Sequence, residues 1–180
     1  MPNSLRGDSR TLAQPKFHGR EPRTRSALEL CIDDQSPLGH SLDATAGERL
    51  SFGGAVFLIK ASTESTAGAF AIIEEVDPLD TPLHVHANED EFFYVIEGEH
   101  VFTVGEEDFP AGPGAAVFAP RHVPHAHRRR VPRAGRFLTM VSPAGFEGFF
   151  RELSAAEAAG GAGPEAYESA SKKYGITWLN

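Results

Sequence analysis

The stretch that decides the fold runs from Pro82 to Glu91 and reads PLHVHANEDE. Within it, His84 and His86 are two residues apart, so on a β-strand both imidazoles would point to the same face. Glu91 then opens a run that is rich in aromatic and β-branched residues, which predicts a second strand. Two neutral imidazoles and one carboxylate suit a divalent transition metal ion, so the stretch predicts a metal site between strands.

A second group of histidines follows about thirty residues later, where residues 120–127 read PRHVPHAH. This segment could supply a further imidazole to the same ion. His125 and His127 would share a face if the segment is a strand, whereas His122 fits a turn better. Spacing alone therefore leaves open which of these histidines completes the site.

Short β-type runs separated by Gly and Pro dominate the chain from about residue 40. They cover residues 52–59, 68–76, 91–96, 100–104, 115–119, 123–129 and 136–141. Many short strands with turn signals and no helix between them are typical of an antiparallel barrel or sandwich. We therefore predict an all-β fold.

A helix is predicted after these strands. Phe146, Phe149, Phe150 and Leu153 recur at the spacing of one helical face. Ser142 would be the N-cap and Pro143 the first helical residue. A glycine-rich segment at 160–164 would end this helix, residues 165–173 would form a last short helix, and residues 175–179 would form a docked apolar tail. Such a row of Phe side chains fits an ordinary core as well as a pocket wall.

The chain divides into three predicted parts. These are an N-terminal arm (1–28) that is polar and rich in Arg, Pro and Ser, a barrel with its closing helix (29–155), and a C-terminal helix and tail (156–180). The formal net charge of -8 argues against nucleic acid as a partner, because phosphate binding needs a basic surface.

The composition also indicates where the protein works. Cys31 is the single cysteine, so no internal disulfide can form. The N-terminal residues lack an apolar run, and no stretch approaches the roughly 18 apolar residues of a membrane span. We therefore expect a cytoplasmic protein without a membrane partner.

The two histidine segments together resemble the sequence motifs of the cupin superfamily. The pattern His84-x-His86-x4-Glu91-x6-Gly98 matches the first cupin motif, and residues 114–125 are similar to the second. The second motif departs from the family at His122, where Gly is usual. The resemblance implies a double-stranded β-helix (jelly-roll) barrel. It also implies one divalent metal ion, of Fe, Ni, Mn, Co, Cu or Zn, bound by His84, His86, Glu91 and His125.

Two further segments resemble the single-domain, quercetin-dioxygenase-like cupins, namely residues 89–95 (EDEFFYV) and 142–150 (SPAGFEGFF). That resemblance implies a homodimer with a small-molecule substrate or ligand, and it gives Glu91 a catalytic role as a base. We expect a dioxygenase-like oxidoreductase acting on a small aromatic or enolic compound. A metal-dependent isomerase, cyclase or decarboxylase, and a cupin that only binds its ligand, remain as alternatives. The expected substrate pocket consists of Phe93, Phe102, His127, Phe146, Phe149 and Phe150.

Overall fold

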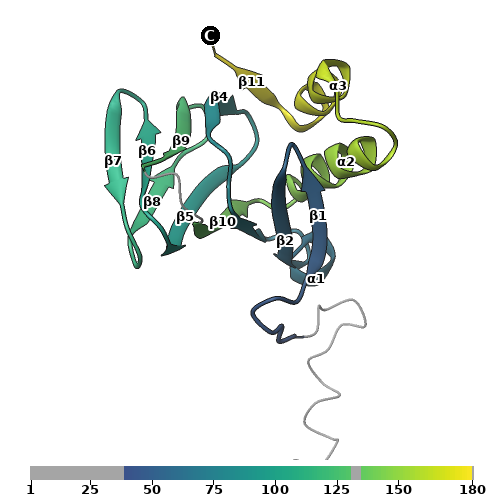
Figure 1. The fold of residues 1–180 in the computed structure, drawn as a ribbon, viewed down its shortest axis with the longest axis horizontal. Coiled ribbons are helices and arrows are strands. Elements are labelled where there is room, and N and C mark those ends of the chain that lie inside the picture. The colour runs from purple at the N-terminus through teal and green to yellow at the C-terminus, as the bar shows by residue number, and fades with distance from the viewer. Residues whose placement is uncertain (1–38, 131–134, 180) are drawn as a thin grey trace, which may run out of the picture. The chain divides into compact units, whose positions relative to one another are not determined.

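Two antiparallel β-sheets frame the protein in the computed structural model, which describes residues 39–130 and 135–179. The six-stranded sheet has the order β1 (Glu48–Phe52), β2 (Ala55–Ala61), β3 (Ala71–Val76), β10 (Arg136–Ser142), β5 (Asp90–Glu97) and β8 (Ala116–Ala119). The five-stranded sheet has the order β11 (Ile176–Trp178), β4 (Thr81–His86), β9 (His125–Arg129), β6 (His100–Val104) and β7 (Glu107–Ala111). The helices are α1 (Thr63–Thr66), α2 (Glu147–Ala158) and α3 (Pro164–Tyr174). This arrangement confirms the predicted all-β jelly-roll with short C-terminal helices (Figure 1).

Tight turns join many of the sequential strands and set their register. Between β1 and β2 the turn consists of Gly53 and Gly54, whose φ angles are 59° and 87°. Two successive positive φ angles define the turn type that matches the twist of a hairpin, and glycine adopts them without strain. The resulting register places Leu50 opposite Phe57, and both side chains are buried.

Apolar side chains form two buried clusters, one on each side of the cavity described below. The first joins the β1–β3 region to the helices and is made by Leu50, Phe52, Ala55, Phe57, Ile59, Ala71, Ile73, Val141, Phe146, Phe149, Phe150, Leu153, Ala170 and Ile176. The second consists of Phe93, Val95, Phe102, Ala111, Val117, Ala119 and Phe137. The predicted apolar face of α2 is thus confirmed, and it packs on the β1–β2 hairpin (Figure 1).

The predicted start of this helix is wrong. Ser142 is the last residue of β10, where it pairs with Asp90, so it cannot act as an N-cap. The chain then turns at Gly145, which has a φ of 129°, and α2 begins at Glu147. The Glu147 carboxylate accepts a hydrogen bond from the Gly145 backbone N–H at 2.8 Å, which fixes the turn from inside the helix. The strand is therefore longer than its apolar pattern suggests.

The C-terminal tail is a strand of the barrel. Residues of β11 pair with β4, and this register sets Ile176 opposite His86 and Trp178 opposite His84. The sequence predicts a docked tail at this point but not a strand. The predicted N-terminal arm (1–28) lies outside the described residues. Within residues 39–130 and 135–179, none of the helices is long and apolar enough to cross a membrane.

Candidate metal centre

Four buried side chains from three strands converge inside the barrel. His84 and His86 come from β4, Glu91 from β5 and His125 from β9. One nitrogen or oxygen of each lies within 4.8 Å of the corresponding atom of every other. Alternation along β4 points both of its imidazoles inward, as the sequence predicts, and the pairing of β4 with β9 sets His125 opposite His84. This group could hold a metal ion.

Hydrogen bonds to the outer nitrogen of each imidazole fix its orientation. The Nδ1–H of His84 donates to the backbone carbonyl of Pro82 at 2.8 Å, and that of His125 donates to the carbonyl of Val123 at 2.9 Å. The Nδ1 of His86 lies 3.2 Å from the Oε2 atom of Glu89, a buried carboxylate. Such contacts hold the tautomer that leaves Nε2 available, and they recur around metal-binding histidines.

The charges of the group are balanced by one buried ion pair. The Nε2–H of His125 donates to Oε2 of Glu91 at 2.8 Å. Burial raises the pKa of Glu91, but the surrounding imidazoles outweigh it and bring the pKa down to about 2. Burial lowers the pKa of His125, but Glu91 outweighs it and leaves that pKa above its ordinary value. An ion bound by both groups would displace the His125 Nε2 proton, so metal binding should release a proton.

The remaining imidazoles fit a metal ion in their protonation and in their contacts. Burial, followed by the charge of His125, lowers the pKa of His84 to about 4, so this ring is neutral at pH 7 and can act as a ligand. The Nε2 atom of His86 is buried and has no hydrogen-bond partner among the described residues; its nearest opposite charge is Oε1 of Glu91 at 3.9 Å. A buried polar atom without a partner is rare, and a ligand role explains this one.

The loop between β8 and β9 is hydrogen-bonded to β4 and β5, the two strands that carry the residues resembling the first cupin motif. The Arg121 side chain donates to both carboxylate oxygens of Asp90 at 3.0 Å, next to Glu91. The backbone N–H of His122 donates to the carbonyl of His86 at 2.8 Å. His122 has a φ of 66°, a conformation that favours glycine, which explains why the resembled motif usually has Gly here. His122 is an exposed turn residue and does not join the four converging side chains.

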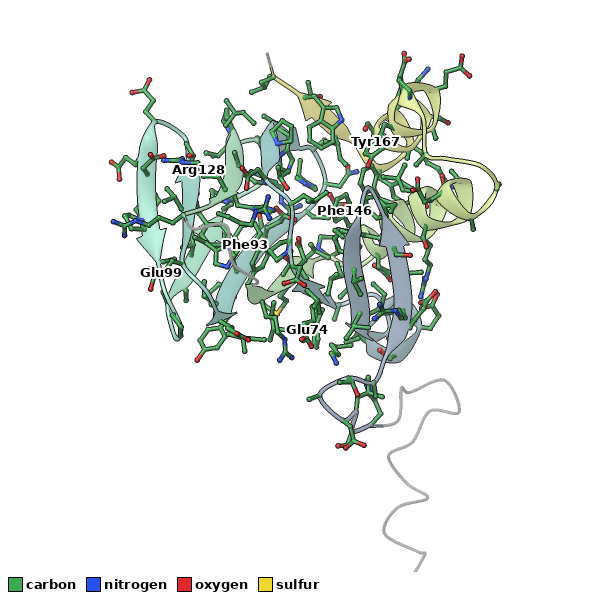
Figure 2. The ribbon with its side chains drawn as sticks, in the orientation of Figure 1. Glu74, Phe93, Glu99, Arg128, Phe146 and Tyr167 are labelled. Atoms are coloured by element: carbon green, nitrogen blue, oxygen red, sulfur yellow. The ribbon has the colours of Figure 1, made fainter. Side chains whose placement is uncertain are left out.

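A cavity of about 170 Å³ opens beside these side chains. His84, His86 and Glu91 form part of its wall, and the rest is mostly aromatic. The predicted pocket residues Phe93, His127, Phe146, Phe149 and Phe150 line it, together with Phe52, Phe57, Tyr167, Ile176 and Trp178, which the sequence analysis did not select. Figure 2 labels Phe93 and Phe146 in the interior, and Glu99 and Arg128 at the periphery. The Phe side chains of α2 therefore serve both as core and as cavity wall.

Two aromatic rings lie directly against the histidines. The Phe146 ring meets the His86 ring edge to face, with centroids 4.4 Å apart. The Trp178 ring lies 5.1 Å from the His84 ring and is held by a hydrogen bond from its Nε1 to the Ser171 hydroxyl at 2.8 Å. Both imidazoles are buried, with exposed fractions of 6% for His84 and 1% for His86.

Phe102 does not line the cavity, which corrects the sequence-based prediction. Its ring stacks behind Phe93 with centroids 4.7 Å apart and belongs to the second buried cluster. Strand β6, which carries Phe102, lies between β9 and β7, so β9 separates it from β4 and the cavity wall there. Proximity of this kind depends on strand order, which the sequence pattern does not give.

Two buried, titratable side chains outside the four converging ones, Glu75 and His127, also line the cavity. Burial raises the pKa of Glu75 on β3 to about 8, while the Thr139 hydroxyl donates to its Oε1 atom at 2.8 Å. Burial lowers the pKa of His127 on β9 to about 3, and its Nε2 atom lies 2.6 Å from the hydroxyl of Thr81. Sequence reasoning missed Glu75, although an acidic residue inside the apolar run of 71–76 was a usable signal.

Comparisons with known proteins agree with this architecture. Residues 72–141 match the family model described as Cupin domain. Quercetin 2,3-dioxygenase of Bacillus subtilis (strain 168) is 26% identical over 114 residues, which is 62% of this chain and 34% of that protein. The chain thus matches about a third of the length of this curated relative.

Solved structures show the same fold. KdgF from Halomonas sp. aligns with a TM-score of 0.53 and 19% identity over 60% of this chain and 96% of that one. An RmlC-like cupin from Shewanella frigidimarina NCIMB 400 aligns with a TM-score of 0.51 and 20% identity over 61% and 95% of the two chains. These likenesses concern the fold alone, and the matched Cupin domain and the distant quercetin 2,3-dioxygenase similarity support membership of the cupin superfamily.

Proposed function

We propose that this cupin is a metal-dependent, dioxygenase-like oxidoreductase that acts on small aromatic or enolic compounds. The observation that carries the proposal is that His84, His86 and Glu91 form part of the wall of a largely aromatic cavity. A flat aromatic ring suits such walls. The distant similarity to quercetin 2,3-dioxygenase supports the choice of reaction, as do the segments that resemble quercetin-dioxygenase-like cupins.

The ion of this proposal is one divalent transition metal held by His84, His86, Glu91 and His125, with Fe, Ni, Mn, Co, Cu and Zn as candidates. When bound, such an ion supplies Lewis acidity and, if it is redox-active, a path for electrons between substrate and dioxygen. The protein's part is to hold the imidazoles in one tautomer through the contacts of their Nδ1 atoms.

Glu91 is proposed as the base. Its Oε1 atom makes no hydrogen bond within the described residues, so it could take the proton from a substrate hydroxyl. The surrounding imidazoles lower the pKa of Glu91, so its carboxyl is ionised at neutral pH. Enols and phenols are more acidic than alcohols, so a carboxylate base should deprotonate them more readily.

Oxygen uptake tests this proposal. The metal-free protein would be loaded separately with each candidate ion, and oxygen consumption would be measured with quercetin and with other enolic aromatics. We expect uptake that depends on substrate and on a redox-active ion, and that is lost in His125→Ala. Full metal occupancy without oxygen uptake would contradict the oxidoreductase assignment. Product analysis would then separate non-oxidative turnover, such as isomerisation or decarboxylation, from simple ligand binding.

We also propose that the protein is a cytoplasmic homodimer. The outer face of the six-stranded sheet carries exposed apolar side chains, including Tyr94, Ile96 and Phe118, which a second copy could cover. The single cysteine fits a reducing compartment. The molar mass in solution, measured by light scattering, tests the dimer. Phe118→Glu should give a monomer, and a wild-type monomer would contradict this proposal.

A further inference from the structure

Glu75 stands apart from the other groups in the cavity because the proposed metal site and base do not use it. It faces inward from β3, in register with Phe57 on β2 and Phe137 on β10, both of which are buried. Its Oε1 atom accepts the Thr139 hydroxyl at 2.8 Å. Its Oε2 atom makes no hydrogen bond within the described residues, and the nearest basic nitrogen is Nε2 of His127 at 3.9 Å.

A carboxyl group buried among phenyl rings is unfavourable unless it has a use or a partner. Among residues 39–130 and 135–179, Glu75 has only one direct hydrogen-bond partner, although it lines an accessible cavity. Its neighbour Glu74 shows the contrast, because it points to the other face and pairs with Lys60 at 3.1 Å and with Arg136. Glu75 therefore offers a fixed but unused hydrogen-bonding oxygen in the place where a ligand would lie.

We propose that Glu75, beside His127, forms a positioning subsite that hydrogen-bonds a second, uncharged oxygen of the substrate while another oxygen faces His84, His86 and Glu91. The inference rests on the proposed function and narrows its substrate class to aromatic compounds that carry oxygen at two places. The hydrogen-bonding atom of this subsite is Oε2 of Glu75, because Nε2 of His127, 3.9 Å away, already lies 2.6 Å from the Thr81 hydroxyl.

The charge of the cavity wall supports an uncharged group. Glu75, Asp80 and Glu91 line the cavity, and none of the described lining residues is a lysine or an arginine. Apart from the proposed metal ion, a carboxylate or phosphate of a ligand would find no cationic side chain of lysine or arginine among these residues. A hydroxyl or carbonyl group can instead pair with a protonated Glu75, which burial favours by raising its pKa.

A comparison of two flavonols distinguishes the contribution of the subsite to binding from that of the metal site. Quercetin and 3-hydroxyflavone share the same 3-hydroxy-4-keto group, but only quercetin carries hydroxyls on its outer rings. Binding to the Zn²⁺-loaded protein would be followed by quenching of Trp178, the one tryptophan of the chain, which lines the cavity. Zn²⁺ is redox-inactive, so the flavonol is bound and not consumed.

The variants are Glu75→Leu, Glu75→Gln and the exposed control Glu107→Gln. We expect Glu75→Leu to weaken quercetin binding by about tenfold, the effect of one lost hydrogen bond. Binding of 3-hydroxyflavone should change less than about twofold, because it does not make that bond. Glu75→Gln keeps a donor and an acceptor and should restore most of the affinity. Thr139→Val removes the hydrogen bond that holds the Glu75 carboxyl. It should weaken quercetin binding more than 3-hydroxyflavone binding, but by less than Glu75→Leu does.

Unchanged quercetin affinity in a folded, Zn²⁺-loaded Glu75→Leu protein would overturn the inference, as would equal loss for the two flavonols. If Glu75→Leu does not fold, Thr139→Val decides the question by the same criterion. Failure of both flavonols to bind the Zn²⁺-loaded wild-type protein would overturn the proposed function and this inference with it. That result is seen before any variant is compared, so the two failures can be distinguished.

Discussion

His84 on β4 lies directly opposite His125 on β9, and their ring centroids are 4.4 Å apart. The strand pairing that builds the five-stranded sheet therefore also builds half of the candidate metal centre. Because backbone carbonyls accept from the Nδ1 atoms of both rings, the sheet itself helps to orient this pair. The site should thus be largely formed before an ion binds.

His86 is the exception, because a side chain orients it. Glu89 is the partner of its Nδ1 atom, so Glu89→Ala should leave the four candidate ligands in place but weaken metal binding. Loss of such an outer contact typically reduces affinity by about 10- to 100-fold. A competition titration against a chromophoric chelator would measure the change, with Glu107→Gln as the exposed control. Equal affinities in Glu89→Ala and wild type would contradict the orienting role.

The Glu91→Gln variant distinguishes the role of Glu91 as a metal ligand from its role as a base. The amide oxygen can still bind an ion, so metal content should fall only modestly, whereas turnover should drop by about 10²- to 10⁴-fold because the base is lost. Parallel metal analysis and oxygen uptake would check both parts. Activity that survives in a metal-loaded Glu91→Gln protein would remove Glu91 from the catalytic step.

Trp178 provides an optical signal for the site. Its ring lies 5.1 Å from that of His84, and it is the single tryptophan of the chain. Titration of the metal-free protein with Cu²⁺ or Ni²⁺ should quench its fluorescence and saturate near one equivalent. The same titration of His84→Ala should show little saturable quenching. An identical curve in that variant would place the bound ion elsewhere.

Glu75 should make the stability of the metal-free protein depend on pH. Its pKa is about 8 in the folded protein against 4.5 for the free side chain, so the folded state binds the proton more tightly. The stability that this proton confers is complete below pH 4.5 and is lost as the pH rises to about 8. Glu75→Gln does not titrate and should be more stable than wild type by roughly 3 kcal/mol at pH 7, with little difference at pH 4. Urea unfolding across this range checks the sign, and a pH-independent difference would refute it.

Much of the fold follows from local sequence patterns. Alternation places His84 with His86 and Glu91 with Phe93, and the burial of these side chains agrees with it. Glycine-rich turns separate short β-type runs, and the helical spacing of four apolar residues gives the buried face of α2. These features depend on residues that are close in sequence. The prediction that the two histidine segments contribute to one metal site rests on their resemblance to the two cupin motifs.

Other features depend on which strands become neighbours, and no local pattern carries that information. Strand β11 is only three residues long and is stabilised by its pairing with β4, so its own sequence gives a weak signal. The sequence predicts Phe102 in the pocket because it is an aromatic residue on a predicted strand, but strand order puts it behind Phe93. Glu89 follows His86 by three residues and carries a hydrogen-bond acceptor. This spacing was a usable signal for the group that orients the Nδ1 atom of His86.

The metal content of purified protein tests the central claim most directly. After reconstitution and removal of loose metal, wild type should hold about one transition metal ion per chain, and His84→Ala or His125→Ala should hold almost none. His122→Gly is the matched control, because it removes a nearby exposed imidazole at a φ of 66° that glycine adopts without strain. We predict full occupancy in that control. A wild-type protein that binds no metal, or full occupancy in His125→Ala, would contradict the proposed metal centre.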